Sequence, residues 1–441
     1  SHTTTGASKM RIEVVSDEHE AADREALAWL GLQRLDAADV RGELDLAKGQ
    51  LKRLRRRLDK RSGTDMGGWF IRYTGDEELF ERSRERVRDL QPIWHETEAL
   101  PDGAMIGGKT FREWKDACCV AAAAVLHHIE FATRLKTTHP GVDLRNLLTM
   151  FISRDDLDRV WQERGLEPAW IRAVSQAMTL DCQSIDEVLL HHDTPFPFYV
   201  DMGREFILAP SLSALLNPFV GVVRHLRSCY RGDWDRAVDS REAVFRSDLA
   251  AIFNEPRYVM LPSGVPLRRS DGTLLTDVDA VVQDKVSGTV ALVQLKWHDI
   301  FGKSLRERES RKRNLLAANQ WVERVAAWVG ERSSADIAMA VGMPVAECQQ
   351  AEKPVILVVA RYAARFSGAG ACDSRAAWLS WPELVRAATS DALEIDILRH
   401  VATAFEGVDR SARPDSDDRE AASWRLRFSG LDVEVVQRTR V

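Results

Sequence analysis

Cysteine is scarce in this chain, with six among 441 residues, two of them adjacent at Cys118 and Cys119. No two cysteines have CxxC spacing, and no group of cysteines and histidines has the spacing of a zinc site. The sequence therefore indicates neither a disulfide framework nor a structural zinc ion. We expect a protein of a reducing compartment, the cytoplasm.

Long apolar runs and an excess of positive charge are missing as well. No stretch approaches the roughly 20 apolar residues that span a bilayer, so we expect no membrane association, and no secretory signal is visible. The 61 Lys and Arg residues are outnumbered by 67 Asp and Glu, which gives a formal net charge of −6. This balance excludes general attraction of the protein to nucleic acid, so such a partner has to be bound by a local basic patch.

The composition is that of a globular protein, because 45% of the residues are hydrophobic and 29% are charged. The length predicts two or three domains. We interpret residues 1–10 as a non-native leader and residues 11–63 as a helical hairpin or coiled-coil-like segment. Residues 64–235 have a mostly helical pattern, interrupted by a predicted hairpin near 196–209 with Gly203 at its turn.

The pattern changes after Trp234. The elements predicted there are a helix at 239–253, strands at 257–260, 274–283 and 289–297, a helix at 304–329 and a strand at 354–362. This order predicts an α/β domain over residues 236–408, in which the second helix is a crossover that places the last two strands parallel. Residues 409–422 are polar enough for a linker, and residues 423–441 have the pattern of a terminal β-hairpin.

Polar residues interrupt the apolar hairpin TDVDAVVQDKVSGTVALVQLKW, residues 276–297. A turn at 286–288 sets Asp279 opposite Gln294 and Asp277 opposite Lys296. Side chains alternate between faces along a strand, and opposed residues start about 5 Å apart at Cβ. We therefore expect the four polar groups to converge. The alternative is a cross-strand ion pair between Asp277 and Lys296 on a solvated face.

A further acid precedes this hairpin, on the predicted helix REAVFRSDLAAIF. Phe245 and Leu249 mark its apolar stripe, and Glu242 lies one turn before Phe245. This spacing points Glu242 toward the sheet, where an acid needs a cation or another partner. The alternative is a first-turn carboxylate that is favoured by the helix dipole.

These residues resemble the PD-(D/E)XK nuclease superfamily over roughly residues 239–362. In that family an acid on the first helix and an Asp on the second strand bind Mg²⁺, and the third strand supplies an acid, any residue and a lysine. The matching positions here are Glu242, Asp279 with Asp277 as an alternative, Gln294 and Lys296. Gln294 departs from the usual acid and is similar to the QxK form of Mrr-like restriction enzymes.

The resemblance implies a restriction-endonuclease-like catalytic domain that hydrolyses phosphodiester bonds with Mg²⁺, for which Mn²⁺ can substitute. The expected substrate is double-stranded DNA, cut by an endonuclease in restriction or defence against foreign DNA. Lys296 would position or deprotonate the attacking water, or stabilise the transition state. Because Gln294 is neutral, the alternative is a nuclease-like scaffold that binds nucleic acid or protein without cutting it.

Basic residues follow Lys296 and open the next predicted helix. They are Lys303, Arg306, Arg308, Arg311, Lys312 and Arg313. Their place after the active strand predicts contacts to phosphates of a duplex. The alternative is a solvated helix face with local Glu/Arg pairs. For the helical N-terminal half we expect recognition of substrate, a partner protein or another copy of the chain.

A second motif, GAMIGGKT at 103–110, fits the P-loop pattern GxxxxGK[ST] and indicates an alternative function in nucleotide binding through Lys109. The preceding segment is polar and contains Pro101, whereas a P-loop follows a buried strand. Thr110 also has Glu113 three residues later, which predicts a capping box at the start of a helix.

Overall fold

The computed structural model describes most of the 441 residues. The described residues are 8–16, 18–37, 56, 58–59, 62–65, 70–141, 143, 148–185, 197–298, 305–343, 353–364, 372–389, 396–406, 419–428 and 431–439. The chain divides into two compact units, one of residues 1–30 and 242–441 and one of residues 31–241. The boundary that the sequence indicated at 235–236 therefore lies at 241–242.

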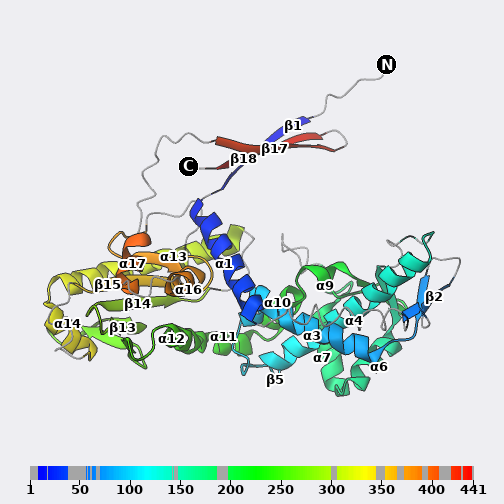
Figure 1. Cartoon of the computed structure of the whole chain (residues 1–441), viewed down its shortest axis with the longest axis horizontal. Coiled ribbons are helices and arrows are strands. Elements are labelled where there is room, and N and C mark those ends of the chain that lie inside the picture. The colour runs from blue at the N-terminus through cyan, green and yellow to red at the C-terminus, as the bar shows by residue number, and fades with distance from the viewer. Residues whose placement is uncertain are drawn as a thin grey trace. The chain divides into compact units, whose positions relative to one another are not determined.

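The first unit is built on a mixed five-stranded sheet (Figure 1), which confirms the predicted α/β class. Its order is β10 (Tyr258–Met260), β13 (Ala280–Asp284), β14 (Val290–Lys296), β15 (Val355–Ala360) and β16 (Ala377–Ser380). The first three strands are antiparallel, whereas β14, β15 and β16 are parallel. The parallel pairing of β14 and β15 across a helix is as predicted, and β16 was not predicted.

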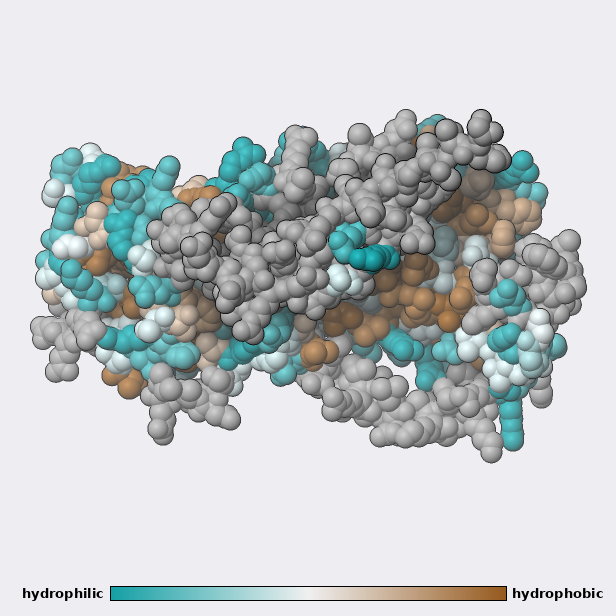
Figure 2. Space-filling model, turned by 90° about the horizontal axis from the view of Figure 1, so that it is seen from above, coloured by the Kyte–Doolittle hydropathy of each residue, from teal (hydrophilic) through white to brown (hydrophobic). Residues whose placement is uncertain are grey.

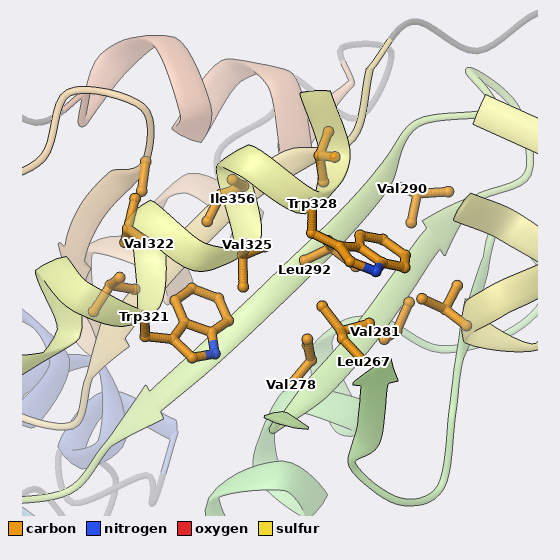
Figure 3. Packing of buried hydrophobic residues seen from close by; sticks show 14 of the residues in the cluster. Leu267, Val278, Val281, Val290, Leu292, Trp321, Val322, Val325, Trp328 and Ile356 are labelled. Atoms are coloured by element: carbon orange, nitrogen blue, oxygen red, sulfur yellow. The ribbon is translucent and has the colours of Figure 1, made fainter. Parts of the chain in front are cut away.

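Helices cover both faces of this sheet. Side chains of α12 (Arg241–Ile252), α16 (Trp381–Thr389) and α17 (Ile397–Ala404) pack on one face. Those of α13 (Leu305–Gly330) and α14 (Ser334–Val341) pack on the other. Figure 3 shows Trp321 and Trp328 of α13 against Val278, Val281 and Leu292. Burial on both faces explains the nearly unbroken apolar runs of the central strands.

The strand predicted at 274–283 is wrong in one respect, because it is divided at Asp279. Its first part, β12 (Leu274–Val278), pairs with β11 (Val265–Arg268) in a separate two-stranded ribbon. Its second part is β13. The division places Asp279 at the junction of two strands that belong to different sheets.

A third sheet of the first unit joins the two ends of the described chain. Strands β17 (Arg419–Phe428) and β18 (Leu431–Thr439) form the predicted terminal hairpin, and β1 (Ser8–Ser16) adds to β18 in parallel. Two assignments need correction. Residues 8–10 of the segment that we interpreted as a leader are part of β1, and β17 begins inside the segment 409–422 that we interpreted as a linker.

Helix α1 (Glu18–Ala37) agrees with the helical pattern of residues 11–63, although residues 11–16 are in β1. Its first half belongs to the first unit. Leu30 packs in the core that α12 covers, and the carboxylate of Asp23 accepts a hydrogen bond of 3.2 Å from Ala364 N. Much of the rest of 11–63 lies outside the described residues.

The second unit is mostly helical, as predicted. Its helices are α3 (Glu77–Leu90), α4 (Phe111–Thr138), α6 (Arg154–Glu163), α7 (Pro168–Met178), α9 (Leu212–Leu216), α10 (Phe219–Cys229) and α11 (Arg231–Asp239), with 3-10 turns at Gln91–Ile93 and His95–Glu98. Helix α4 is long and apolar enough to cross a membrane, but most of its apolar residues are buried in the protein interior, as in a core helix.

The strands of the second unit are short. They are β2 (Ser62–Asp65), β3 (Phe70–Tyr73), β4 (Met105–Ile106), β5 (Lys109–Thr110), β6 (Thr149–Ser153), β7 (Thr179–Leu180), β8 (Tyr199–Asp201) and β9 (Phe206–Pro210). Strands β8 and β9 form the hairpin predicted near 196–209, and Gly203 has a φ of +73° in its turn. The sheet order β6-β9-β8-β7 was not predicted.

Several large apolar side chains of the second unit are exposed. They are Met105, Phe151, Ile185, Met202, Phe206, Leu212, Leu215 and Leu216. Figure 2 shows one face of the molecule, on which apolar side chains form a continuous brown area among hydrophilic ones. Exposed apolar patches are common at sites of interaction, but nothing in the structure indicates what covers these residues.

Candidate active site

The predicted register of the hairpin is confirmed. Ala280 pairs with Val293 and Val281 with Leu292, which is the predicted register, and the ladder ends there, one residue before Asp279. The Asp279 N–H donates to Val293 O at 3.1 Å, and the Gln294 side-chain amide donates to the Asp279 carboxylate. Gly288 has a φ of +74° in the turn, a backbone conformation that glycine adopts without strain.

Asp279 is the buried acid of this site, with only 6% of its surface exposed. Burial raises the pKa of its carboxyl to about 6, since the charged form is poorly solvated there. The Leu295 N–H, 2.7 Å from Oδ2, and the charge of Lys296 favour the ionised form. The negative charges of Glu242 and Asp277 raise the pKa further by repulsion.

Glu242 lies near Asp279 as expected, but it does not point into the core. Phe245 and Leu249 are buried on α12, whereas the Glu242 side chain is 53% exposed and forms an ion pair with Arg246 one turn later. Arg246 Nε also donates to the main-chain oxygen of Asp279 at 2.7 Å. One guanidinium therefore contacts both elements that carry the acids, a role that we did not predict for it.

Asp277 occupies a different position from the one predicted. It is exposed on β12, where it pairs with Pro266 of β11 and not with Lys296. Its main-chain oxygen accepts a 2.7 Å hydrogen bond from Trp321 Nε1 of α13. The alternative of a cross-strand ion pair is therefore wrong, and Asp277 contributes negative charge beside the site.

Lys296 is the last residue of β14 and is half-buried. Among the described residues no acid forms an ion pair with its amine, so the charge is available to a bound anion. The end of the strand is fixed by Arg361, whose main-chain N–H donates to the main-chain oxygen of Lys296 at 2.8 Å. The Arg361 side chain is only 5% exposed, lies 2.5 Å from Asp248 and has its guanidinium 4.7 Å from the centre of the Trp297 ring.

The oxygen ligands at this site suit a hard divalent cation. They are the carboxylates of Asp279 and Glu242 and the side-chain carbonyl of Gln294, the ligand types that bind Mg²⁺. Burial raises the pKa of Asp279 because its charged form is poorly solvated, and a bound cation would favour that form. Within the described residues, no three Asp, Glu, His or Cys side chains could together hold a metal ion. Gln294 would therefore have to complete the set.

The predicted phosphate contacts are only partly described. Lys303 lies outside the described residues, and Arg306 and Arg308 are in the first turns of α13, where their side chains are not described. Lys312 is 3.1 Å from Glu309, and Arg313 Nε is 3.4 Å from Glu309 O. Arg311 is half-buried. The alternative of local pairing therefore holds for Lys312.

The GAMIGGKT segment does not have P-loop geometry. Its strands β4 and β5 have two residues each and form a hairpin, with Gly107 and Gly108 at positive φ in the turn. Lys109 is 3.3 Å from Glu113, and Thr110 and Glu113 form the predicted capping box of α4. The segment is thus a short hairpin that leads into the capped N-terminus of α4, and not a phosphate-binding loop.

No family model matches this chain, and no curated protein and no solved structure matches it significantly.

Proposed function

We propose that the first unit is a metal-dependent nuclease with a restriction-endonuclease-like core. The order α12, β10, β13, β14, α13, β15, with β14 and β15 parallel, supports this proposal. The observation that carries it is the hydrogen bond between Gln294 of β14 and the buried Asp279 at the junction before β13, with Lys296 two residues after Gln294 and Glu242 linked to Asp279 through Arg246. A buried carboxylate whose pKa is raised beside a lysine is typical of functional sites.

The residues at this site supply what phosphodiester hydrolysis needs. Asp279, with Glu242 and Gln294, would hold Mg²⁺ or Mn²⁺, and the bound cation lowers the pKa of water and stabilises negative charge on the phosphate. Lys296, fixed by the contact of its main chain with Arg361, would hold the attacking water or the charged phosphate oxygens. Asp279 has to be ionised to bind the cation, so protons compete with Mg²⁺ and the affinity for Mg²⁺ should fall as the pH is lowered through about 6.

Double-stranded DNA is the proposed substrate, and restriction or defence against foreign DNA in the cytoplasm is the proposed setting. Helix α13 begins nine residues after Lys296 and is basic in sequence, and we propose that it contributes contacts to phosphates beside the bond that is cut. The second unit would recognise the substrate, a partner protein or a second copy of the chain.

Cleavage of supercoiled plasmid tests this function. With Mg²⁺ or Mn²⁺ we expect nicked or linear product from the wild type and from Asp271→Ala, an exposed aspartate on the ribbon of β11 and β12. We expect none from Asp279→Ala or with EDTA. Intact plasmid in every reaction, from folded protein, would refute a nuclease that is active without a further partner.

A second candidate function is binding without cleavage. It is favoured by the neutral Gln294, whose amide donates a hydrogen bond to the Asp279 carboxylate, and by the ion pair between Glu242 and Arg246. A plasmid that is retarded in a gel but not cut in Mg²⁺, with the same retardation by Asp279→Ala, would identify this function.

A further inference from the structure

Arg246 lies between the two acids of the candidate site. Its side chain is 16% exposed. Nη2 binds the carboxylate of Glu242 on the same helix, and Nε donates to the main-chain oxygen of Asp279 at 2.7 Å. The two contacts use different nitrogens of one rigid, planar group. The contact with Glu242 lies within α12 and the contact with Asp279 joins α12 to the strand junction, so the guanidinium fixes the Glu242 carboxylate relative to the main chain of Asp279.

The junction at Asp279 needs such a contact. The chain leaves the ribbon of β11 and β12 at Val278 and enters the five-stranded sheet at Ala280. The N–H of Asp279 is held by Val293 O of β14, whereas its carbonyl accepts from Arg246. The loop at Gly264 closes over the same point. A Cβ there would lie 2.9 Å from Val278 O and 3.7 Å from Arg246 Nη2. Arg246 is thus packed where the main chain changes sheets.

The direction of the Asp279 carboxylate follows from this main-chain position. Its Oδ2 accepts the Leu295 N–H at 2.7 Å and the Gln294 amide, both of which belong to β14. A shift of the Asp279 carbonyl away from Arg246 would rotate the peptide and turn the carboxylate away from β14. The arginine can therefore act on the acid without touching its side chain.

We propose that Arg246 is a positioning residue, whose shape and not only its charge holds Asp279 and Glu242 in place for the cation. This inference rests on the proposed function. The competing account is that Arg246 only offsets the negative charge of Glu242. Lysine keeps the charge and loses the planar two-point contact, so Arg246→Lys separates the two accounts.

The Leu295 N–H is a direct probe of the carboxylate, because it donates to Oδ2 in the absence of any metal. We would measure its hydrogen exchange by NMR in ¹⁵N-leucine-labelled protein, together with the buried Leu292 and Leu357 of the same sheet. For both Arg246→Lys and Arg246→Ala we expect at least about tenfold faster exchange at Leu295 and unchanged exchange at the other two. Arg324→Lys, at an exposed arginine of α13, is the control and should change none of the three.

Wild-type exchange at Leu295 in Arg246→Lys would overturn the proposal, and so would equal acceleration of all three leucines, which reports lower global stability. If Arg246→Ala does not fold, Arg246→Lys alone decides between the two accounts. Titration of the same proteins with Mn²⁺ gives an independent result. Absence of Mn²⁺ binding and of cleavage by the wild type refutes the nuclease, whereas the exchange data still decide whether Arg246 positions Asp279.

Discussion

Asp279, at the junction of β12 and β13, and Gln294 of β14 are joined by a hydrogen bond that the amide of Gln294 donates to the carboxylate of Asp279. The two side chains are therefore within reach of one cation. A third carboxylate at position 294 would repel Asp279 when no metal is bound, whereas the amide stabilises it. Gln294 therefore brings less negative charge to the proposed cation site than an acid would, but its hydrogen bond with Asp279 forms without a cation.

Asp279→Asn should stabilise the folded protein at neutral pH. The folded-state pKa of about 6 lies above the ordinary value of 3.8, so the unfolded state gives up its proton at lower pH than the folded state does. The wild type therefore loses stability as the pH rises from about 4 through about 6, and Asn at this position does not. The difference of about two pKa units corresponds to about 3 kcal/mol, because one unit is about 1.4 kcal/mol. The amide oxygen of asparagine can still accept the Leu295 N–H.

Urea unfolding from pH 3.5 to pH 8 measures this effect. The gain in the free energy of unfolding should be absent below about pH 4, grow through about pH 6 and then level off. Asp271→Asn, at an exposed aspartate of the same unit, should instead lose stability relative to the wild type as the pH rises, because hydrogen bonds from Thr273 lower the pKa of Asp271. A stability difference between wild type and Asp279→Asn that is independent of pH would contradict a raised pKa.

Gln294→Glu should tighten binding of Mn²⁺, because it adds a charged ligand to Asp279 and Glu242. We expect at least about a tenfold lower Kd, or about 1.4 kcal/mol, by isothermal titration calorimetry. The same variant should be less stable without metal at neutral pH, owing to repulsion from Asp279. Gln320→Glu, on the exposed face of α13, is the matched control, and an unchanged Kd for Gln294→Glu would place the cation elsewhere.

Trp321 and Trp328 form a matched pair for testing the importance of β12. Both are buried on α13, and each indole N–H donates to a main-chain oxygen of the ribbon, Trp321 to Asp277 and Trp328 to Arg268. Replacement of either by Phe should lower the free energy of unfolding by about 1–3 kcal/mol. Only Trp321→Phe should also slow plasmid cleavage, since Asp277 lies two residues before Asp279. Equal cleavage rates for the two variants would contradict this difference.

Arg257→Ala should destabilise the far end of the hairpin. Asp284 is completely buried, and Arg257 Nη2 lies 2.9 Å from its Oδ2. Removal of the arginine leaves a buried charge, which costs about 3 kcal/mol or more. Adding Asp284→Asn should restore part of the loss in urea unfolding. A double variant that is less stable than Arg257→Ala would contradict this explanation.

The register of the β13–β14 hairpin could be predicted from the sequence, because it depends on a short turn and on the alternation of side chains between the two faces, both of which are local features. The break at Asp279 could not, since VDAVV has no glycine or proline and the division depends on pairing of β12 with β11. Pairing of β1 with β18 joins residues more than 400 positions apart and left no local signal. Packing of Leu30 and Asp23 in the C-terminal unit depends on the same kind of distant contact.

The candidate site was predictable only in part. Spacing along α12 identified Glu242, but its rotation relative to Phe245 decides that the carboxylate is exposed, and a periodicity of 3.6 does not fix that rotation. Arg246 was missed, although its position four residues after Glu242 is a local signal for an ion pair. Arg361 was missed because its partners Asp248, Trp297 and Trp381 come from separate elements.

We propose that Asp279, before β13, and Lys296, at the end of β14, act in the hydrolysis of phosphodiester bonds. The most direct measurement is the rate of plasmid cleavage in Mg²⁺ by Lys296→Ala beside Lys285→Ala, in which the lysine removed lies at the other end of the same hairpin and pairs with Glu255. We predict a loss of at least about a hundredfold for Lys296→Ala, the scale of one electrostatic group in a transition state, and wild-type cleavage for Lys285→Ala. Equal rates for the two variants would contradict the claim.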